Sequence, residues 1–257
     1  MHQRLGLPLL IALLCLSGGA ISKAEVEQGD GLRVTFDADF APQTLPRDRP
    51  APIAVEIHGS VATTDGSHPP ALRWLEVDLH RSGRISTRGL PVCTAPTLQS
   101  TSTKEALARC GPARVGRGSF RADIDLGEGV AATGAILAFN SRKAGKPALL
   151  LHLFGSVPTR FTLVVPLAIG HRKEGQFGTV LRARVPKLGG GLGSVTKIDL
   201  TIARRYSFAG KRRSYLSAAC AAPTGFNVAI FPFARGSFRF EGRREIRTTL
   251  IRDCRVR

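Results

Sequence analysis

Acidic, imidazole and indole side chains occupy every second position from Trp74 to His80. Alternate residues of a β-strand point to the same side, so a strand here would place Trp74, Glu76, Asp78 and His80 on one face. Such a face could bind a divalent ion or position a sugar, as in a secreted glycan-active enzyme. The same spacing is also that of the solvated face of a half-buried sheet. Glycoside hydrolysis uses two carboxyl groups that face each other across a cleft, about 5–10 Å apart. Residues of a single strand do not form such a cleft.

No other pattern in the sequence assigns catalysis, a cofactor or a metal. The Gly-x-Ser-x-Gly signature of serine hydrolases is absent. The glycine-rich run 189–194 lacks a Lys-Ser/Thr pair and precedes a period-two segment, so it is interpreted as a turn rather than a phosphate-binding loop. His152 lies in an apolar run and is interpreted as a hydrogen-bonded core residue. We therefore assign no catalytic, cofactor-binding or metal-ligating residues and favour a non-enzymatic protein.

Basic residues gather in the C-terminal part of the chain. The formal net charge is +18, and residues 201–257 contain 13 Lys and Arg against three acidic residues. Such an excess attracts anionic polymers, and Tyr206 and Tyr215 could stack on sugars or bases beside the cations. The alternatives are an arginine-rich composition without function, or charges that protect an exposed sheet edge from pairing with other chains. The candidate anion-binding residues are Arg204, Arg205, Lys211, Arg212, Arg213, Arg243, Arg244 and Arg247.

The N-terminal segment 1–24 has the layout of a secretory signal. A positive start is followed by the apolar run 5–16 and then by small residues. Twelve apolar residues are too few for a spanning helix, which needs about 20. Cleavage after Ala24 is favoured, with Ala20 as the alternative. Cys15 could indicate a lipoprotein, but Leu14 before it is larger than the residue expected there. The protein is therefore expected to be secreted or associated with the cell envelope.

Four cysteines remain after the signal: Cys93, Cys110, Cys220 and Cys254. An even number in an exported chain indicates disulfides, and no Cys-x-x-Cys pair suggests zinc. Four cysteines allow three pairings. We favour Cys93–Cys110 and Cys220–Cys254, because each pair lies within one local stretch.

Apolar and polar residues alternate along most of the mature chain, which is typical of antiparallel strands with one buried face. Clusters of Gly, Pro, Asp and Ser separate these runs, so the sequence predicts an all-β, antiparallel β-sandwich-type architecture. Two runs, 148–157 and 161–169, are apolar on both faces. One short helix is predicted near 102–110, where Ser102 and Glu105 form a capping box and Gly111-Pro112 ends it. The alternating runs are 32–40, 53–58, 75–80, 120–126 and 197–202.

A weak internal echo divides the mature chain near Val157. In each part an alternating run is followed by a cysteine and then by a Gly-Ser-Phe-Arg segment, at 118–121 and 236–239. Two similar halves would fit this echo. The expected organisation is a signal peptide at 1–24, a β-sandwich half with a disulfide-pinned helix at 25–157, and a basic β-rich half at 158–257.

Several stretches resemble a group of exported actinobacterial proteins with no assigned activity. These are GSVATTDGSHPPALRWLEVDL, GLPVC, the helical segment ending at Cys110, VGRGS and SVTKIDLTIARRYSFAGKRRSYL. The resemblance covers most of the mature chain. It implies export and a β-rich fold, and it supplies no functional residues.

These observations predict a non-enzymatic secreted or envelope-associated protein that binds an anionic envelope polymer or acidic glycan through its basic C-terminal region. The glycan-active enzyme with its site at Trp74–His80 is the alternative. A third possibility, a protein–protein adhesion module, would need an exposed apolar patch. No cofactor, no sequence-specific nucleic acid and no transmembrane segment after signal removal are expected.

Overall fold

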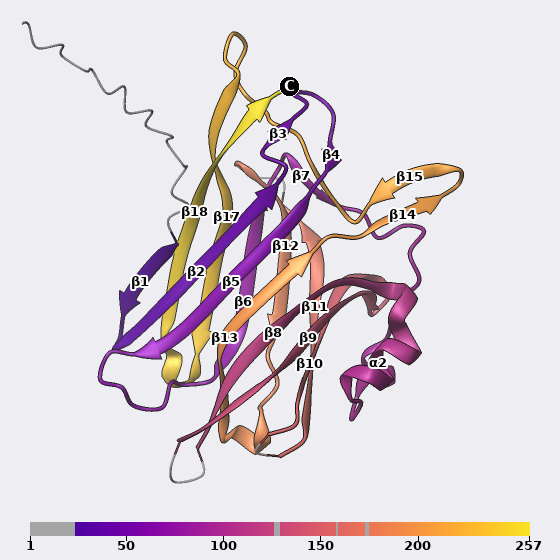
Figure 1. The fold of residues 1–257 in the computed structure, drawn as a ribbon. Helices are drawn as coiled ribbons and strands as arrows, with labels where there is room; N and C mark the ends of the chain where they lie inside the picture. Colours follow the sequence, from indigo (N-terminus) through magenta and orange to yellow (C-terminus); the bar gives the residue numbers. More distant parts are fainter. Residues whose placement is uncertain (1–23, 126–128, 158, 173–174) are drawn as a thin grey trace, which may run out of the picture.

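The computed structural model describes residues 24–125, 129–157, 159–172 and 175–257 (Figure 1). Strands make up 63% of the chain and helices 9%, which confirms the predicted mostly-β class. Apart from Ala24, the predicted signal segment 1–24 lies outside the described residues.

Thirteen strands form one large curled sheet. Neighbours in the sheet are antiparallel except for the last pair, β18 and β3, which is parallel. In sheet order the strands are β1 (Glu25–Gly29), β2 (Leu32–Ala41), β5 (Ala54–Thr63), β13 (Gly193–Ile202), β8 (Arg114–Asp125), β9 (Gly129–Lys143), β10 (Lys146–Gly155), β11 (Phe161–His171), β12 (Phe177–Arg184), β6 (Leu72–His80), β17 (Val228–Phe240), β18 (Glu245–Val256) and β3 (Thr44–Leu45).

Two small sheets and a few short helices complete the fold. The first sheet has the order β4 (Ala51–Pro52), β16 (Leu216–Ala218) and β7 (Gly83–Ile85), and it lies at the upper end of the large sheet (Figure 1). The second is the hairpin of β14 (Arg205–Phe208) and β15 (Lys211–Ser214). The helices are α1 (Ala95–Leu98), α2 (Thr103–Cys110), η1 (Gly111–Ala113), η2 (Gly189–Gly191) and η3 (Glu241–Arg243).

The chain itself requires the large sheet to curl. β2 and β3 are consecutive strands, yet β2 lies near one end of the sheet and β3 at the other. Phe36 of β2 accordingly packs on Phe238 of β17, with ring centroids 5.4 Å apart. The result is a half-barrel whose two ends meet through side chains. The predicted sandwich is therefore not what forms, because one sheet covers its own apolar face instead of packing against a second sheet.

An arginine joins the two ends of the half-barrel. Arg252 of β18 donates from Nε to the Ala38 carbonyl oxygen at 3.1 Å and to Asp39 Oδ1 at 2.7 Å. It also donates from Nη2 to Asp37 Oδ1. Its side chain is only 7% exposed. A buried charge is tolerated where it is paired and hydrogen-bonded, so Arg252 and β2 fix the distance between the sheet ends.

The two predicted halves share the same sheet. β13, from the second half, lies between β5 and β8 of the first, and β6 of the first lies between β12 and β17 of the second. The two segments are therefore interleaved.

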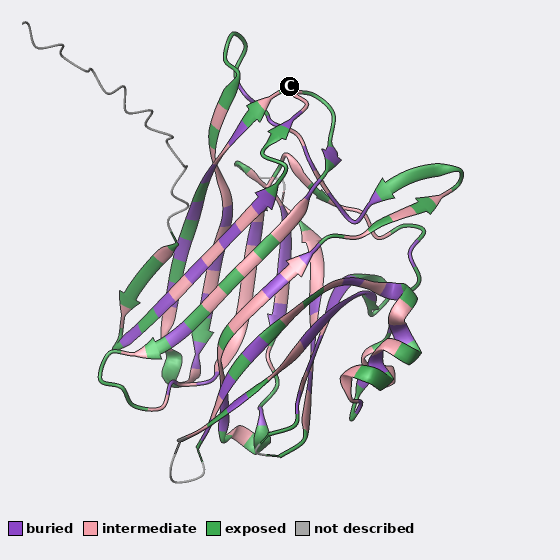
Figure 2. Ribbon diagram, viewed as in Figure 1, coloured by how far each residue is buried: buried purple, intermediate pink, exposed green. Residues whose placement is uncertain are grey.

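The alternation seen in the sequence matches burial along the strands (Figure 2). Along β2, Leu32, Val34 and Phe36 are buried, while the residues between them are exposed or half-buried. β10 differs, because its outer face lies under α1, α2 and the residues around them. Leu150 and His152 are therefore buried on that side, and Leu149 and Leu153 on the inner side. This two-sided burial accounts for the apolar run 148–157.

The predicted helix is α2. Ser102 Oγ accepts from the Glu105 backbone N–H, and the Glu105 carboxylate accepts from the Ser102 backbone N–H at 2.8 Å. This reciprocal pair confirms the capping box. The hydrogen bonds of the box also hold the pKa of Glu105 below its usual range.

Candidate functional site

The fold separates the candidate anion-binding residues into two places. The β14–β15 hairpin projects from the body near the upper end of the half-barrel, while η3 forms the lower turn between β17 and β18 (Figure 1). Arg243 belongs to η3, Arg244 follows it, and Arg247 lies on β18. The hairpin group consists of Arg204, Arg205, Lys211, Arg212 and Arg213. We call these five residues the hairpin cations.

The hairpin forms because its turn residues suit a tight connection. Ala209 and Gly210 have φ values of 51° and 71°. Two-residue loops with positive φ at both positions match the twist of paired strands. The register then places Tyr206 opposite Arg213 and Ser207 opposite Arg212. The short turn thus brings the basic residues of both strands onto one narrow projection.

The hairpin is held against the segment that follows β7. Tyr206 Oη donates to the Arg88 carbonyl oxygen at 2.8 Å. The Arg88 and Arg213 guanidinium carbons lie 5.9 and 5.8 Å from the centroid of the Phe208 ring, within the range of cation–π attraction. Phe208 also fills the space beside Gly89, where a Cβ atom would lie 2.3 Å from the ring. These contacts orient the hairpin relative to the body.

The hairpin has an unbalanced positive charge. No acidic residue occurs from 200 to 240. Within the described part of the chain, none of the hairpin cations forms an ion pair. By contrast, Arg247 pairs with Glu245, with Nε and Oε1 2.8 Å apart. Arg205 and residues 211–213 are exposed, so their charges are available to an external anion.

Glu76 and Asp78 lie on the outer face of β6 and are held by arginines. Asp78 is buried and accepts from Arg235 Nη2 at 2.6 Å and from Arg172 Nε. Glu76 Oε2 accepts from Arg182 Nε at 2.6 Å, and its Oε1 accepts from Arg172. The hydrogen bond to Asp78 and the nearby Glu76 charge raise the pKa of Arg172. Both carboxylates are thus engaged in an ion-pair network that connects neighbouring strands.

His80 and Trp74 have other neighbours. His80 Nδ1 lies 2.8 Å from Ser82 Oγ, and its ring centroid lies 4.9 Å from that of Phe231. Burial, and secondarily repulsion from Arg81, lowers the pKa of His80. Trp74 lies beneath the Arg239 guanidinium, with the Arg239 Cζ atom 5.8 Å from its ring centroid. The carboxylate pair and the imidazole predicted to act together therefore have separate partners. The arginines that bind the carboxylates come from β11, β12 and β17 or lie next to them, and no local spacing revealed them.

A cavity of about 270 Å³ lies inside the half-barrel. Its walls are the inner faces of the large sheet, and residues of the small β4–β16–β7 sheet line its upper end. We call this space the interior cavity. The sequence did not predict it, because inward-facing residues alternate in the same way whether the interior is filled or hollow.

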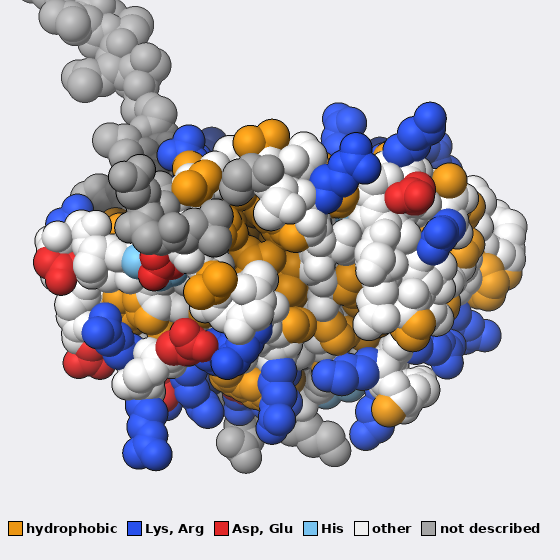
Figure 3. Space-filling model, turned by 90° about the horizontal axis from the view of Figure 1, so that it is seen from below, with side chains coloured by type: hydrophobic (Ala, Val, Ile, Leu, Met, Phe, Trp, Pro, Cys, Tyr) orange, Lys and Arg blue, Asp and Glu red, His pale blue; other side chains and the backbone are white. Residues whose placement is uncertain are grey.

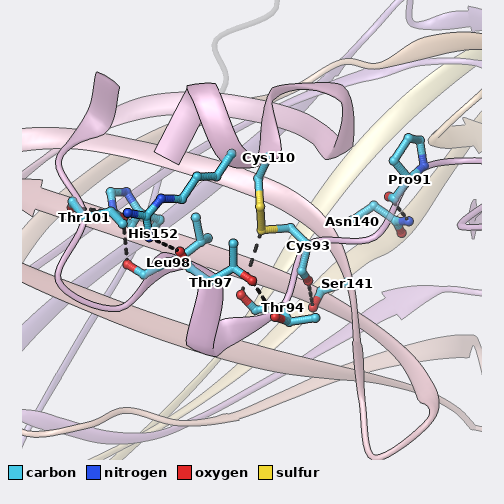
Figure 4. The surroundings of a disulfide bond; sticks show 11 residues. Pro91, Cys93, Thr94, Thr97, Leu98, Thr101, Cys110, Asn140, Ser141 and His152 are labelled. Atoms are coloured by element: carbon cyan, nitrogen blue, oxygen red, sulfur yellow. Dashed lines mark hydrogen bonds between the residues drawn. A yellow bond between two sulfur atoms is a disulfide. The ribbon is translucent and has the colours of Figure 1, made fainter. Parts of the chain in front are cut away.

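Both predicted disulfides are present: Cys93–Cys110 and Cys220–Cys254. They indicate that the protein matures in an oxidising environment. Cys93 is also fixed to β9, because its backbone N–H donates to the Asn140 carbonyl oxygen at 3.0 Å and its own carbonyl accepts from Ser141 Oγ at 2.6 Å (Figure 4). The first bridge thus fastens α2 to the outer face of the sheet.

His152 lies beneath the same helix and is fully buried. Its Nε2 donates to the Thr101 carbonyl oxygen at 3.0 Å and lies 3.0 Å from Thr101 Oγ1 (Figure 4). This confirms the predicted hydrogen-bonded core histidine. Burial in apolar surroundings disfavours the charged imidazolium and lowers the pKa of His152.

We expect the stability of the protein to fall with acidification on account of His152. Because its pKa is lower in the folded state, the unfolded chain binds the extra proton first. The stabilisation is complete above the ordinary pKa of 6.5 and is lost as the pH falls through the folded-state value. Urea unfolding at pH values on both sides of 6.5 measures the slope. His152→Gln should have a smaller slope, with the remainder due in part to His80, whose pKa is also lowered. An unchanged slope would contradict the assignment.

The described residues contain neither a cluster of metal ligands nor a membrane-spanning helix. No three His, Cys, Asp or Glu side chains in the described ranges gather as metal ligands. None of the helices in that part of the chain is long and apolar enough to cross a membrane. Comparison of the sequence and the structure with protein-family models, curated proteins and solved structures finds no match.

Proposed function

We propose that this chain is an exported, non-enzymatic protein that binds an anionic polymer of the cell envelope, such as a phosphate-bearing polymer or an acidic glycan, through the hairpin cations. The observation that carries the proposal is a projecting hairpin with four cations in its strands and Arg204 just before them. It has no acidic residue, and none of these cations forms an ion pair among the described residues. The signal-like segment 1–24 and the two disulfides support a location outside the cytoplasm.

The shape of the hairpin supports binding to an extended anion. Cations at the end of a projection can approach a polymer without bringing the rest of the protein into contact with it. At physiological salt the screening length is about 8 Å, so only charges held close to the polymer contribute. The fixed contacts of Tyr206 and of Phe208, which immediately precedes the turn, reduce the ordering needed on binding. Electrostatic attraction of this kind weakens as salt is added.

The test is charge reversal on the hairpin. Arg212→Glu with Arg213→Glu should elute from immobilised heparin at markedly lower salt than the parent. At about 1 kcal/mol for each basic residue near an anionic surface, the two substitutions should weaken binding about 30-fold or more. Fluorescence titration with soluble heparin measures this change.

The matched control is Arg243→Glu with Arg244→Glu, which changes the net charge by the same amount at the other end of the molecule. This variant should remain close to the parent on the column. If the two variants elute at the same salt concentration, only the net charge matters, and the hairpin is not the binding site.

A further inference from the structure

Many inward-facing side chains of the half-barrel border open space. Val55, Leu75, Val195 and Phe233 line the interior cavity and are only half-buried. Inward residues at the middle of a strand are buried when a core is filled, as Phe120 of β8 is. Seen from below, hydrophobic side chains show through the middle of the molecule inside a rim of polar and charged ones (Figure 3). The interior is thus apolar, incompletely filled and accessible from its lower end.

The lining of the cavity extends along much of β2. Along β2 its lining extends from Val34 to Phe40, which is about 20 Å at 3.3 Å per residue. A volume of about 270 Å³ spread over that length is enough for one extended hydrocarbon chain. For comparison, an apolar cavity of about 150 Å³ binds benzene. The shape therefore fits a single linear hydrocarbon chain.

A buried tyrosine lines the upper end of the cavity. Tyr215 immediately precedes β16 in the β4–β16–β7 sheet, and it is 1% exposed. Its hydroxyl has no hydrogen-bond partner among the described residues, although buried polar groups are nearly always paired. Burial raises the pKa of Tyr215, so the hydroxyl stays protonated and can donate. Such a donor suits a ligand that carries an acceptor oxygen.

We propose that the interior cavity binds one linear acyl chain, with a carbonyl or carboxylate oxygen of the ligand accepting a hydrogen bond from Tyr215. The inference is independent of polymer binding by the hairpin, since the two sites share no residue. Free fatty acids and acyl esters both offer this chemistry. Arg84, which also lines the upper end, would favour the charged form of a free acid.

Binding is tested on the full chain with dodecanoic acid, methyl dodecanoate and dodecane as probes. Native mass spectrometry should show one dodecanoic acid bound per protein, and the ligand should raise the Tm, because binding to the folded state stabilises it. A free acid is indicated if dodecanoic acid binds more tightly than its ester, and an acyl ester if the order is reversed.

Two variants examine the cavity and the hydroxyl separately. Val195→Phe fills the cavity, so it should abolish binding while raising the Tm of the unliganded protein by about 2–4 °C. Its control is Val228→Phe, at a residue that is 46% exposed, which should bind like the parent. Tyr215→Phe removes only the unpaired hydroxyl, so it should bind the acid and the ester about tenfold more weakly and dodecane as well as the parent does.

The acyl-chain proposal can still be tested if one variant fails to fold, because the parent protein and the other variant give separate results. Absence of dodecanoic acid binding to the parent would overturn the proposal, and so would unchanged binding by Val195→Phe. Equal loss of affinity for all three probes in Tyr215→Phe would show that the hydroxyl does not select an acceptor oxygen. Charge reversal on the hairpin should leave all of these values unchanged.

Discussion

Replacing Arg252 with alanine is expected to destabilise the protein by about 3–5 kcal/mol, the usual effect of removing one partner of a buried ion pair. The side chain is 7% exposed and donates to Asp39 at 2.7 Å, to Asp37, and to the Ala38 carbonyl oxygen at 3.1 Å. Its loss leaves the Asp37 carboxylate, itself only 17% exposed, without this partner. Urea unfolding of parent and variant measures the difference in the free energy of unfolding.

Two comparisons isolate the effect of burial. Arg247→Ala removes a side chain that is 70% exposed and pairs with Glu245, so it should change the free energy of unfolding by less than about 1 kcal/mol. Arg252→Met combined with Asp37→Leu replaces the pair by apolar groups and should recover most of the loss. If Arg252→Ala were no more harmful than Arg247→Ala, apolar contacts alone would hold the sheet ends together.

The features predicted correctly from the sequence are local ones. A strand is recognisable from its own alternation, as in Leu32–Phe40, because the side-chain period is a property of the extended backbone. The α2 capping box needs only Ser102 and Glu105, three residues apart. Both disulfides join cysteines within one stretch, 17 and 34 residues apart. In each case the interacting residues are close in sequence, so their pattern carries the information.

The closure of the half-barrel depends on contacts between distant residues. Arg252 meets Asp37 and Asp39 across more than 200 positions, and Glu76 meets Arg172 across 96. Alternating patterns specify which side of a strand is apolar, but they do not specify what covers that side. A sandwich and a curled single sheet therefore have the same signature in one sequence. The ion pairs of Glu76 and Asp78 could not be predicted for the same reason, since these carboxylates and their arginine partners come from different parts of the chain.

The interior cavity is the feature hardest to explain by packing alone. Cavities created by mutation destabilise proteins by about 24 cal/mol per Å³. An enclosed volume of about 270 Å³ would on that scale correspond to about 6 kcal/mol, which is an upper bound here because the cavity is accessible from its lower end. A sequence selected only for stability would fill such a space with larger side chains. The cavity and the unpaired Tyr215 hydroxyl are more easily understood if a ligand occupies the cavity.

The Cys220–Cys254 bridge is expected to have the second large effect, because it joins the sheet above the cavity to the body. Cys220 lies shortly after β16 and Cys254 lies in β18, 34 residues further along the chain. Loop-closure entropy gives about 4 kcal/mol for a bridge of this span and about 3 kcal/mol for Cys93–Cys110. The alanine double variants should therefore lose similar amounts of stability in urea unfolding.

Hydrogen exchange should distinguish the two bridges where global stability does not. Local opening depends on what each covalent link holds in place. Without Cys220–Cys254, amide protection should fall in β4, β7 and β16, the strands of the small sheet, of which β7 and β16 line the upper end of the cavity. Without Cys93–Cys110, it should fall in α1 and α2 while the small sheet stays protected. If amide protection of the small sheet fell equally in both double variants, that sheet would depend on the overall stability of the protein and not on the Cys220–Cys254 bridge.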